Sequence, residues 1–97
     1  MTRLENRNYI IGREGHIYIN DPAVSKQHAE LQISDGEVYL RDLNSTNGTY
    51  LIKNSRLVPF HEGYVQLHQP IVLGNRQYTI QSLLEIAGAF AADDDEA

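Results

Sequence analysis

The residues that could do chemistry lie in three short segments, at 12–13, 24–29 and 42–49. Arg13, in the first segment, carries a planar fork of N–H donors that suits two oxygens of a phosphate. The second and third segments add short neutral donors on Ser25, Thr46 and Asn47. None of these residues pairs a nucleophile with a neighbouring base. The pattern therefore predicts a site that holds a phosphorylated partner and does not transform it.

A phosphothreonine carries about −1.5 to −2 charges at neutral pH and three strong acceptor oxygens. The hydroxyls of Ser25 and Thr46 sit on short stems that lose little side-chain entropy when they are fixed. Lys26 can donate through its backbone N–H and add a softer attraction through its ammonium. Asn47 carries an amide donor and an acceptor that suit a peptide main chain. Gly48 supplies the positive φ that an Asn-Gly turn favours.

The elements that must position these residues read as short strands, because apolar residues alternate with polar ones along much of the chain. Ala29, Leu31 and Ile33 face one side, while Glu30 and Gln32 face the other. Turn signals separate the runs, at Asp35-Gly36, Asn47-Gly48, Asn54-Ser55, Glu62-Gly63 and Gly74-Asn75. Their spacing predicts an all-β sandwich of two antiparallel sheets of short strands.

The C-terminal part of the chain departs from this pattern. Residues 82–90 contain an apolar run, which we interpret as a strand through about Leu84 with a frayed or weakly helical end. Residues 91–97 are small and acidic and cannot bury apolar area, so we expect them to be disordered. The sequence thus predicts one domain over residues 1–84 and an acidic tail over residues 85–97.

Composition narrows the function classes. The chain has 97 residues, which is enough for one compact domain. It contains no Cys, no apolar run near the length of a membrane span and no secretory signal. We therefore expect a cytoplasmic protein. The net charge is −5, but four acids lie at 93–96. The remaining body has nine acids against eight bases, which gives no electrostatic footprint for nucleic acid. No spacing of His16, His61 and His68 fits a metal site, and we expect no metal or cofactor.

The three segments resemble, in order and spacing, the signature of the forkhead-associated (FHA) domain, a phosphothreonine-recognition module. The resemblance covers Tyr9 to Leu83. The matching residues are Gly12, Arg13, Ile19, Asp21, Val24, Ser25, Lys26, His28, Ala29, Asp42, Leu43, Ser45, Thr46, Asn47, Gly48 and Thr49. Only three residues separate Arg13 from Ile17, which is fewer than the family usually has, so the first binding loop should be short.

The resemblance implies an eleven-stranded β-sandwich and a role for each matching loop residue. Arg13, Ser25 and Thr46 would contact the phosphate, with help from Lys26. Asn47 would bond the peptide backbone next to the phosphothreonine. The loop-shaping positions would be Gly12, His28 and Gly48.

We therefore expect a non-enzymatic, monomeric module that binds phosphothreonine-containing proteins in Ser/Thr kinase signalling, without nucleic acid or membrane as a partner. The alternative is an FHA-like structural or scaffold protein that binds an unphosphorylated partner through a sheet face. A hydrolase triad of Ser25, His28 and either Asp21 or Asp42 is conceivable from the residue types. The sequence contains no nucleophile elbow or oxyanion-hole motif that would support it.

Overall fold

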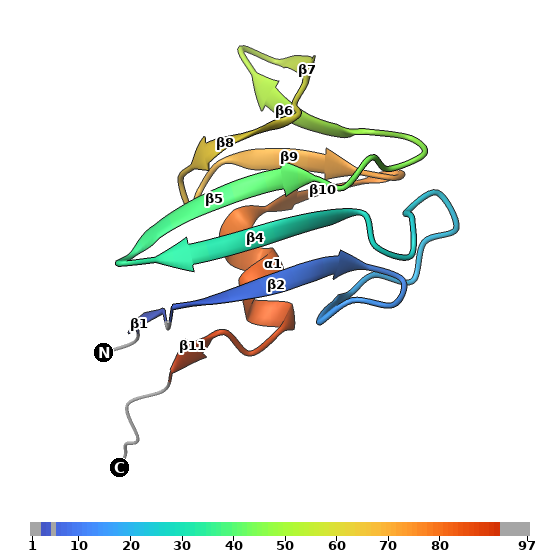
Figure 1. Ribbon diagram of the computed structural model, residues 1–97. Helices are drawn as coiled ribbons and strands as arrows, with labels where there is room; N and C mark the ends of the chain where they lie inside the picture. Colours follow the sequence, from blue (N-terminus) through green and yellow to red (C-terminus); the bar gives the residue numbers. More distant parts are fainter. Residues whose placement is uncertain (1–2, 5, 92–97) are drawn as a thin grey trace.

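The computed structural model describes residues 3, 4 and 6–91, and it confirms the expected sandwich of two packed sheets (Figure 1). One sheet has five strands in the order β3-β2-β4-β5-β8, and the other has four in the order β10-β9-β6-β7. The five-stranded sheet comprises β2 (Arg7–Gly12), β3 (Ile17–Tyr18), β4 (Ala29–Ser34), β5 (Glu37–Asp42) and β8 (Glu62–Val65). The four-stranded sheet comprises β6 (Thr49–Lys53), β7 (Arg56–Pro59), β9 (Pro70–Leu73) and β10 (Arg76–Thr79).

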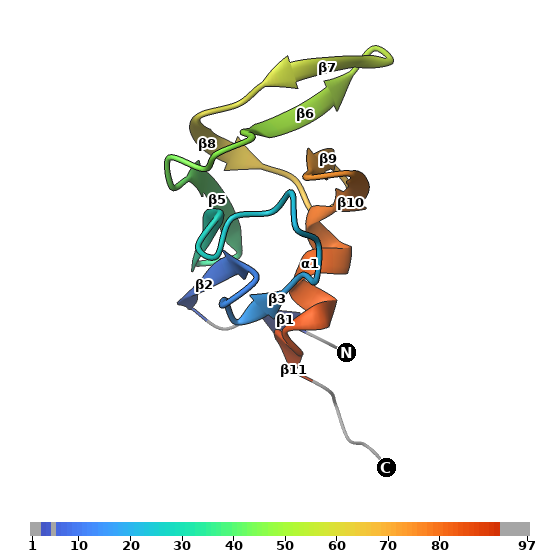
Figure 2. The same cartoon turned by 90° about the vertical axis from the view of Figure 1, so that its right-hand side faces the viewer.

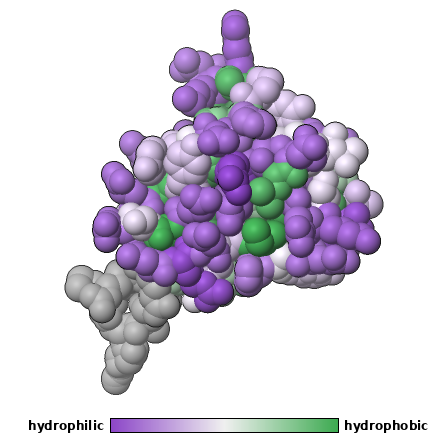
Figure 3. Space-filling model, viewed as in Figure 1, coloured by the Kyte–Doolittle hydropathy of each residue, from purple (hydrophilic) through white to green (hydrophobic). Residues whose placement is uncertain are grey.

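Alternating burial fixes the register of the five-stranded sheet. Ala29, Leu31 and Ile33 of β4 are buried, and Leu31 lies opposite the buried Leu40 of β5. A slip of one residue would turn this apolar set to solvent, so burial of this face excludes that slip. The outer face of this sheet is mostly hydrophilic, as the alternation predicts (Figure 3).

The pairing of β3 is the exception to the antiparallel arrangement. β3 runs parallel to β2, with Ile11 opposite Ile17. Four residues, 13–16, connect the two strands, so the first loop is as short as expected. The imidazole Nδ1 of His16 accepts a hydrogen bond from the N–H of Ile10 (2.9 Å), which folds this turn back on β2.

The β6–β7 hairpin protrudes from the sandwich at the top of Figures 1 and 2. β7 is the last strand of its sheet and pairs only with β6, and all four of its residues are exposed. Leu57 has 57% of its surface exposed and Val58 37%. Lys53 and Arg56 lie opposite each other next to the turn of the hairpin. The hairpin therefore carries apolar and cationic side chains that contribute little to the core.

The predicted strand over residues 82–84 is wrong, because this segment lies in helix α1 (Ile80–Ile86). The Thr79 Oγ1 accepts from the Ser82 N–H (3.1 Å), and the Ser82 Oγ accepts from the Thr79 N–H (3.0 Å), which together form a capping box. Ile80, Leu83 and Leu84 are buried at i, i+3 and i+4. The helical spacing of the buried residues and the local cap thus explain why this segment forms a helix.

The expected domain boundary after residue 84 falls inside α1. Beyond the helix, β11 (Phe90–Ala91) pairs with β1 (Arg3–Leu4) near the N-terminal end of the chain. The expected disorder concerns residues 91–97, and of these 92–97 lie outside the described residues. None of the helices in the described part of the chain is long and apolar enough to cross a membrane.

Replacing Leu83 should test the contribution of α1 to the core. We expect Leu83→Ala to lower the free energy of unfolding by about 2–4 kcal/mol, because the fully buried side chain would leave a cavity. Ile86→Ala is the matched control, since Ile86 lies on the same helix with 49% of its surface exposed, and it should cost less than about 1 kcal/mol. Urea denaturation measures both. Equal losses would contradict the packing of α1 against the sandwich.

Candidate phosphopeptide-binding site

Three connecting segments meet at one end of the sandwich, at the right of Figure 1 and facing the viewer in Figure 2. They are the turn 13–16 between β2 and β3, the segment 19–28 between β3 and β4, and the segment 43–48 between β5 and β6. All the site residues predicted from the sequence lie in these segments or next to them. The sandwich therefore brings together residues up to 36 positions apart in the chain, from Gly12 to Gly48.

His28 joins the second and third segments from inside the fold. Its side chain is fully buried. The Nδ1 atom accepts a hydrogen bond from the Ser25 N–H (3.0 Å), and Nε2 lies 2.9 Å from the Gly48 carbonyl oxygen. A backbone N–H can only donate and a carbonyl can only accept, so the proton of the neutral ring resides on Nε2. His28 thus fixes the distance between the two loops.

Two further hydrogen bonds cross between these loops nearer the surface. The Thr46 N–H donates to the Ser25 Oγ (3.0 Å), and the Asn47 Nδ2 donates to the Ala23 carbonyl (2.8 Å). The first bond leaves the hydroxyl proton of Ser25 available to donate outward. The second gives Asn47 a role in the loop structure that the sequence did not predict. Together they keep Ser25, Thr46 and Asn47 side by side.

Arg13 is anchored at one end of its guanidinium. Its backbone N–H donates to the Ser25 carbonyl (3.2 Å), and its Nε donates to the Val24 carbonyl (2.7 Å). Among the described residues, neither of its terminal Nη groups has a hydrogen-bond or carboxylate partner. The side chain is exposed. The fork is therefore oriented by the protein but retains the donors that a phosphate would use.

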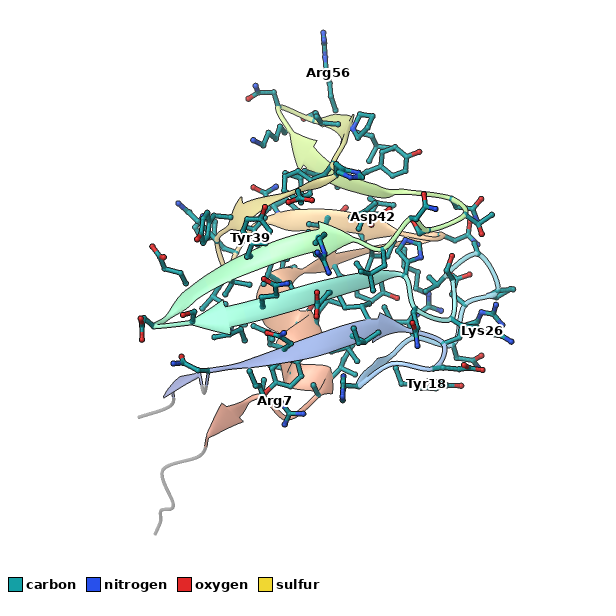
Figure 4. The ribbon with its side chains drawn as sticks, in the orientation of Figure 1. Arg7, Tyr18, Lys26, Tyr39, Asp42 and Arg56 are labelled. Atoms are coloured by element: carbon teal, nitrogen blue, oxygen red, sulfur yellow. The ribbon has the colours of Figure 1, made fainter. Side chains whose placement is uncertain are left out.

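Lys26 and Glu14 lie beside Arg13 at the rim of the site. The Glu14 N–H donates to the Lys26 carbonyl (3.0 Å), and the two side chains form an ion pair at 3.8 Å, both well exposed. Figure 4 shows Lys26 at the loop end of the molecule. Gly12 explains how closely the two segments approach, because a Cβ at this position would lie 2.2 Å from the Lys26 carbonyl oxygen.

Asp42, at the end of β5 in Figure 4, braces the third segment from within. Its carboxylate accepts from the Ser45 hydroxyl (2.6 Å), the Ser45 N–H (3.0 Å) and the Thr49 hydroxyl (2.8 Å). Burial alone would raise the pKa of Asp42, but these hydrogen bonds outweigh burial and hold the pKa below its usual value. The charged carboxylate therefore stabilises the loop that carries Thr46 and Asn47.

Asp21 plays a similar part at the Gly74-Asn75 turn, through a contact that sequence reasoning missed. Its carboxylate accepts from the Asn75 N–H (3.0 Å) and the Ala23 N–H (2.9 Å), and these bonds hold the pKa of Asp21 below its usual value. Gly74 makes the approach possible, because a Cβ there would lie 2.7 Å from the Asp21 carboxylate. Asp21 belongs to the motif, but its partner lies 54 residues away, and nothing in the sequence pairs them.

The arrangement offers donors and no catalytic dyad. His28 bonds the backbone N–H of Ser25 and not its hydroxyl, so the Ser25–His28 spacing does not form a nucleophile and base. Within the part of the chain that the structure describes, no group of three or more His, Cys, Asp or Glu residues could hold a metal ion. The fold is a β-sandwich whose connecting segments are tied together by hydrogen bonds at one end.

The family follows from the comparison with known domains. The model of the FHA domain matches residues 9–81, more than half of the chain, and the chain belongs to this family. FHA domains are phosphothreonine-dependent interaction modules and not enzymes.

Two solved FHA domains and two curated proteins are similar to parts of this chain. The FhaA FHA domain complexed with the intracellular domain of Rv3910 is 32% identical, with a TM-score of 0.67 over 77% of this chain and 80% of that one. The FHA domain of CT664 from Chlamydia trachomatis is 26% identical, with a TM-score of 0.65 over 77% of this chain and 75% of that one. Oxoglutarate dehydrogenase inhibitors of Corynebacterium efficiens and Corynebacterium glutamicum are each 42% identical over 43 residues, or 44% of this chain and 30% of theirs.

The lowered pKa of Asp42 predicts how the fold responds to acid. A depressed folded-state pKa stabilises the fold above the unfolded pKa, about 3.9, and this stabilisation is lost as the pH falls. The free energy of unfolding of the wild type should therefore decrease below about pH 4. Asp42→Asn should be less stable at pH 7 and show a shallower decrease, while Asp21 still contributes part of it.

Urea denaturation between pH 7 and pH 2.5 would measure this effect. Asp35→Asn removes a carboxylate from the exposed turn between β4 and β5 and controls for the change in net charge. An Asp42→Asn profile that runs parallel to the wild type at every pH would show that Asp42 does not brace the loop through its charge.

Proposed function

We propose that the protein binds phosphothreonine-containing partner proteins through Arg13, Ser25, Lys26, Thr46 and Asn47, and so connects Ser/Thr kinase signalling to an assembly or effector. The observation that supports the proposal most directly is the hydrogen bonding of the Arg13 guanidinium. Its Nε is bound to the Val24 carbonyl, and its Nη groups have no partner among the described residues. A guanidinium whose Nε is fixed and whose Nη groups are available can bind two oxygens of a phosphate.

The neighbouring donors complete a phosphate-sized cluster. The Ser25 hydroxyl accepts from the Thr46 N–H and can donate its own proton to a third phosphate oxygen. Asn47 uses one amide hydrogen for the Ala23 carbonyl, which leaves its Oδ1 and the other hydrogen for a peptide main chain. Lys26 adds charge at the rim. The loops are held by hydrogen bonds before any ligand arrives, so little ordering cost opposes binding.

The proposal predicts that Arg13→Ala abolishes binding of a phosphothreonine peptide while the fold persists. Truncating one partner of a hydrogen-bonded charge pair costs about 2–5 kcal/mol, or at least about a 25-fold loss of affinity. Arg13→Lys should also bind more weakly, because an ammonium cannot reproduce the fork. Titration calorimetry with matched peptides that carry phosphothreonine, phosphoserine, Glu or unmodified Thr measures the loss and the requirement for phosphate.

Arg56→Ala is the matched control, because Arg56 is an exposed arginine on the β6–β7 hairpin, away from the three loops (Figure 4). This variant should bind like the wild type. Wild-type affinity of Arg13→Ala for the phosphothreonine peptide would contradict the proposal that Arg13 contacts the phosphate. Equal affinity for the phosphorylated and unmodified peptides would favour a scaffold that docks an unphosphorylated partner.

Glu14 should weaken the phosphopeptide complex of the wild type. Its carboxylate lies 3.8 Å from the Lys26 ammonium, where it competes for the cation and repels a phosphate. Because exposed pairs contribute about 0.2–1 kcal/mol, we expect Glu14→Gln to bind phosphothreonine peptide about 1.4- to fivefold more tightly at low salt. The gain should shrink in about 0.5 M salt, where exposed charges are screened. An affinity that drops in Glu14→Gln would mean that Glu14 serves the complex in another way.

A further inference from the structure

The outer face of the five-stranded sheet carries an exposed aromatic residue away from the binding loops. Tyr64, on the outermost strand β8, has 71% of its surface exposed, the largest fraction among the exposed large apolar and aromatic side chains of the described residues. Its ring packs edge to face against Tyr39, with the ring centroids 5.0 Å apart. Figure 4 shows Tyr39 on the opposite side of the molecule from Lys26. Tyr39 therefore supports an aromatic side chain that the core does not use.

Two hollows adjoin Tyr64. One, of about 260 Å³, extends toward the β4–β5 turn and is lined by the exposed Asp35 and Glu37, neither of which has an ion-pair partner among the described residues. The other, of about 550 Å³, shares Tyr64 and Glu37 with the first and includes the apolar Val65 and Leu67 in its wall. Carboxylates beside an aromatic ring suit a cation. We refer to Asp35, Glu37 and Tyr64 with the two hollows as the Tyr64 surface.

The β6–β7 hairpin carries the complementary groups. Lys53 and Arg56 lie opposite each other next to its turn, both exposed and without an ion-pair partner in the described part of the chain. Val58 is two residues from Arg56, so the two side chains point to the same face of β7, about 7 Å apart. Figure 4 shows Arg56 pointing away from the sandwich. The hairpin therefore ends in two cations beside a partly exposed apolar side chain.

We propose that the protein associates with a second copy of itself by docking the hairpin of each copy onto the Tyr64 surface of the other. The two cations pair with the two carboxylates, and Val58 packs beside Tyr64. Only two residues separate β7 from β8, so the hairpin and the Tyr64 surface are neighbours on one molecule. A two-fold axis between them lets each copy contribute both parts, and such an interface closes at a dimer.

The contact is separate from the features described above. It uses side chains of the hairpin and leaves the backbone edge of β7 unpaired. None of its residues lies in the three connecting segments, so Arg56→Ala remains a control for phosphopeptide binding. The interface is small, and we expect a dissociation constant between about 10 µM and 1 mM. The dimer replaces the monomer that was expected from the sequence.

Replacing Tyr64 tests the aromatic part of the contact. Sedimentation equilibrium of the full chain between about 10 µM and 1 mM measures the dissociation constant of the dimer. Tyr64→Ala should raise this constant at least about fivefold, because a few aromatic anchors dominate such interfaces. Tyr18→Ala is the matched control and should keep the wild-type constant, since Tyr18 has 56% of its surface exposed on β3, at the other edge of the same sheet.

An exchange of charges tests the ionic part. Arg56→Glu and Glu37→Arg should each raise the dissociation constant at least about tenfold, because each change sets like charges against each other at both symmetry-related contacts. An equimolar mixture of the two variants should recover the dimer, since the changed hairpin of one then meets the changed surface of the other. Arg76→Glu makes the same change in net charge at an exposed arginine of β10 and should keep the wild-type constant.

A measurement on the wild type needs no substitution. In a mixture of isotope-labelled and unlabelled chains at about 1 mM, intermolecular NOEs should connect the Val58 methyl groups with the Tyr64 ring. Recovery of the dimer in the mixture of variants, together with these NOEs, supports the proposal. A wild type that stays monomeric at about 1 mM overturns it. A mixture no more dimeric than its components, or equal dissociation constants for Tyr64→Ala and Tyr18→Ala, overturns it as well.

Discussion

The buried imidazole of His28 is the constraint on which the binding end depends. It accepts from one loop and donates to the other, and both bonds require the neutral ring with its proton on Nε2. No carboxylate or hydroxyl could satisfy both partners with the same reach. The bonds from Thr46 to Ser25 and from Asn47 to Ala23 form nearer the surface, between loops that His28 already holds at this separation. A fully buried residue thus determines where the exposed groups of the proposed site lie.

The charged side chains at this end of the sandwich are also divided between an internal and an exposed set. The two acidic residues of the motif, Asp42 and Asp21, turn to backbone N–H groups and hydroxyls within the loops, where their charge is satisfied. The basic residues Arg13 and Lys26 are exposed to solvent. A body with nearly balanced charge can therefore present cations beside the loops, because the two aspartates of the motif are used internally and Glu14 is the acid that faces Lys26 at the rim. The charge of the whole chain says little about the site.

The sequence predicts the parts of this fold that depend on local patterns. Alternation gives the pairing face of β4 and β5, and the loop motifs identify the residues that meet at the binding end. The helix carries a local signal too, since Thr79 and Ser82 cap it and Ile80, Leu83 and Leu84 have a helical spacing. The apolar run by itself fits a strand equally well, which is why the sequence predicts the wrong element here. The contact of Asp21 with Asn75 arises from two chain segments that only the tertiary fold brings together.

The outermost strand, β7, bears on solubility. An exposed edge strand with Leu57 and Val58 is a template on which another chain could add a strand, and such edges promote aggregation. Here the two apolar residues are bracketed by Arg56, whose charge resists stacking, and by Pro59, which has no N–H to offer an incoming strand. Strand length and bracketing together protect the hairpin at high protein concentration. Pro59 is consequently a poor choice for substitution when the protein is concentrated for crystallisation or NMR, although it lies outside the three connecting segments.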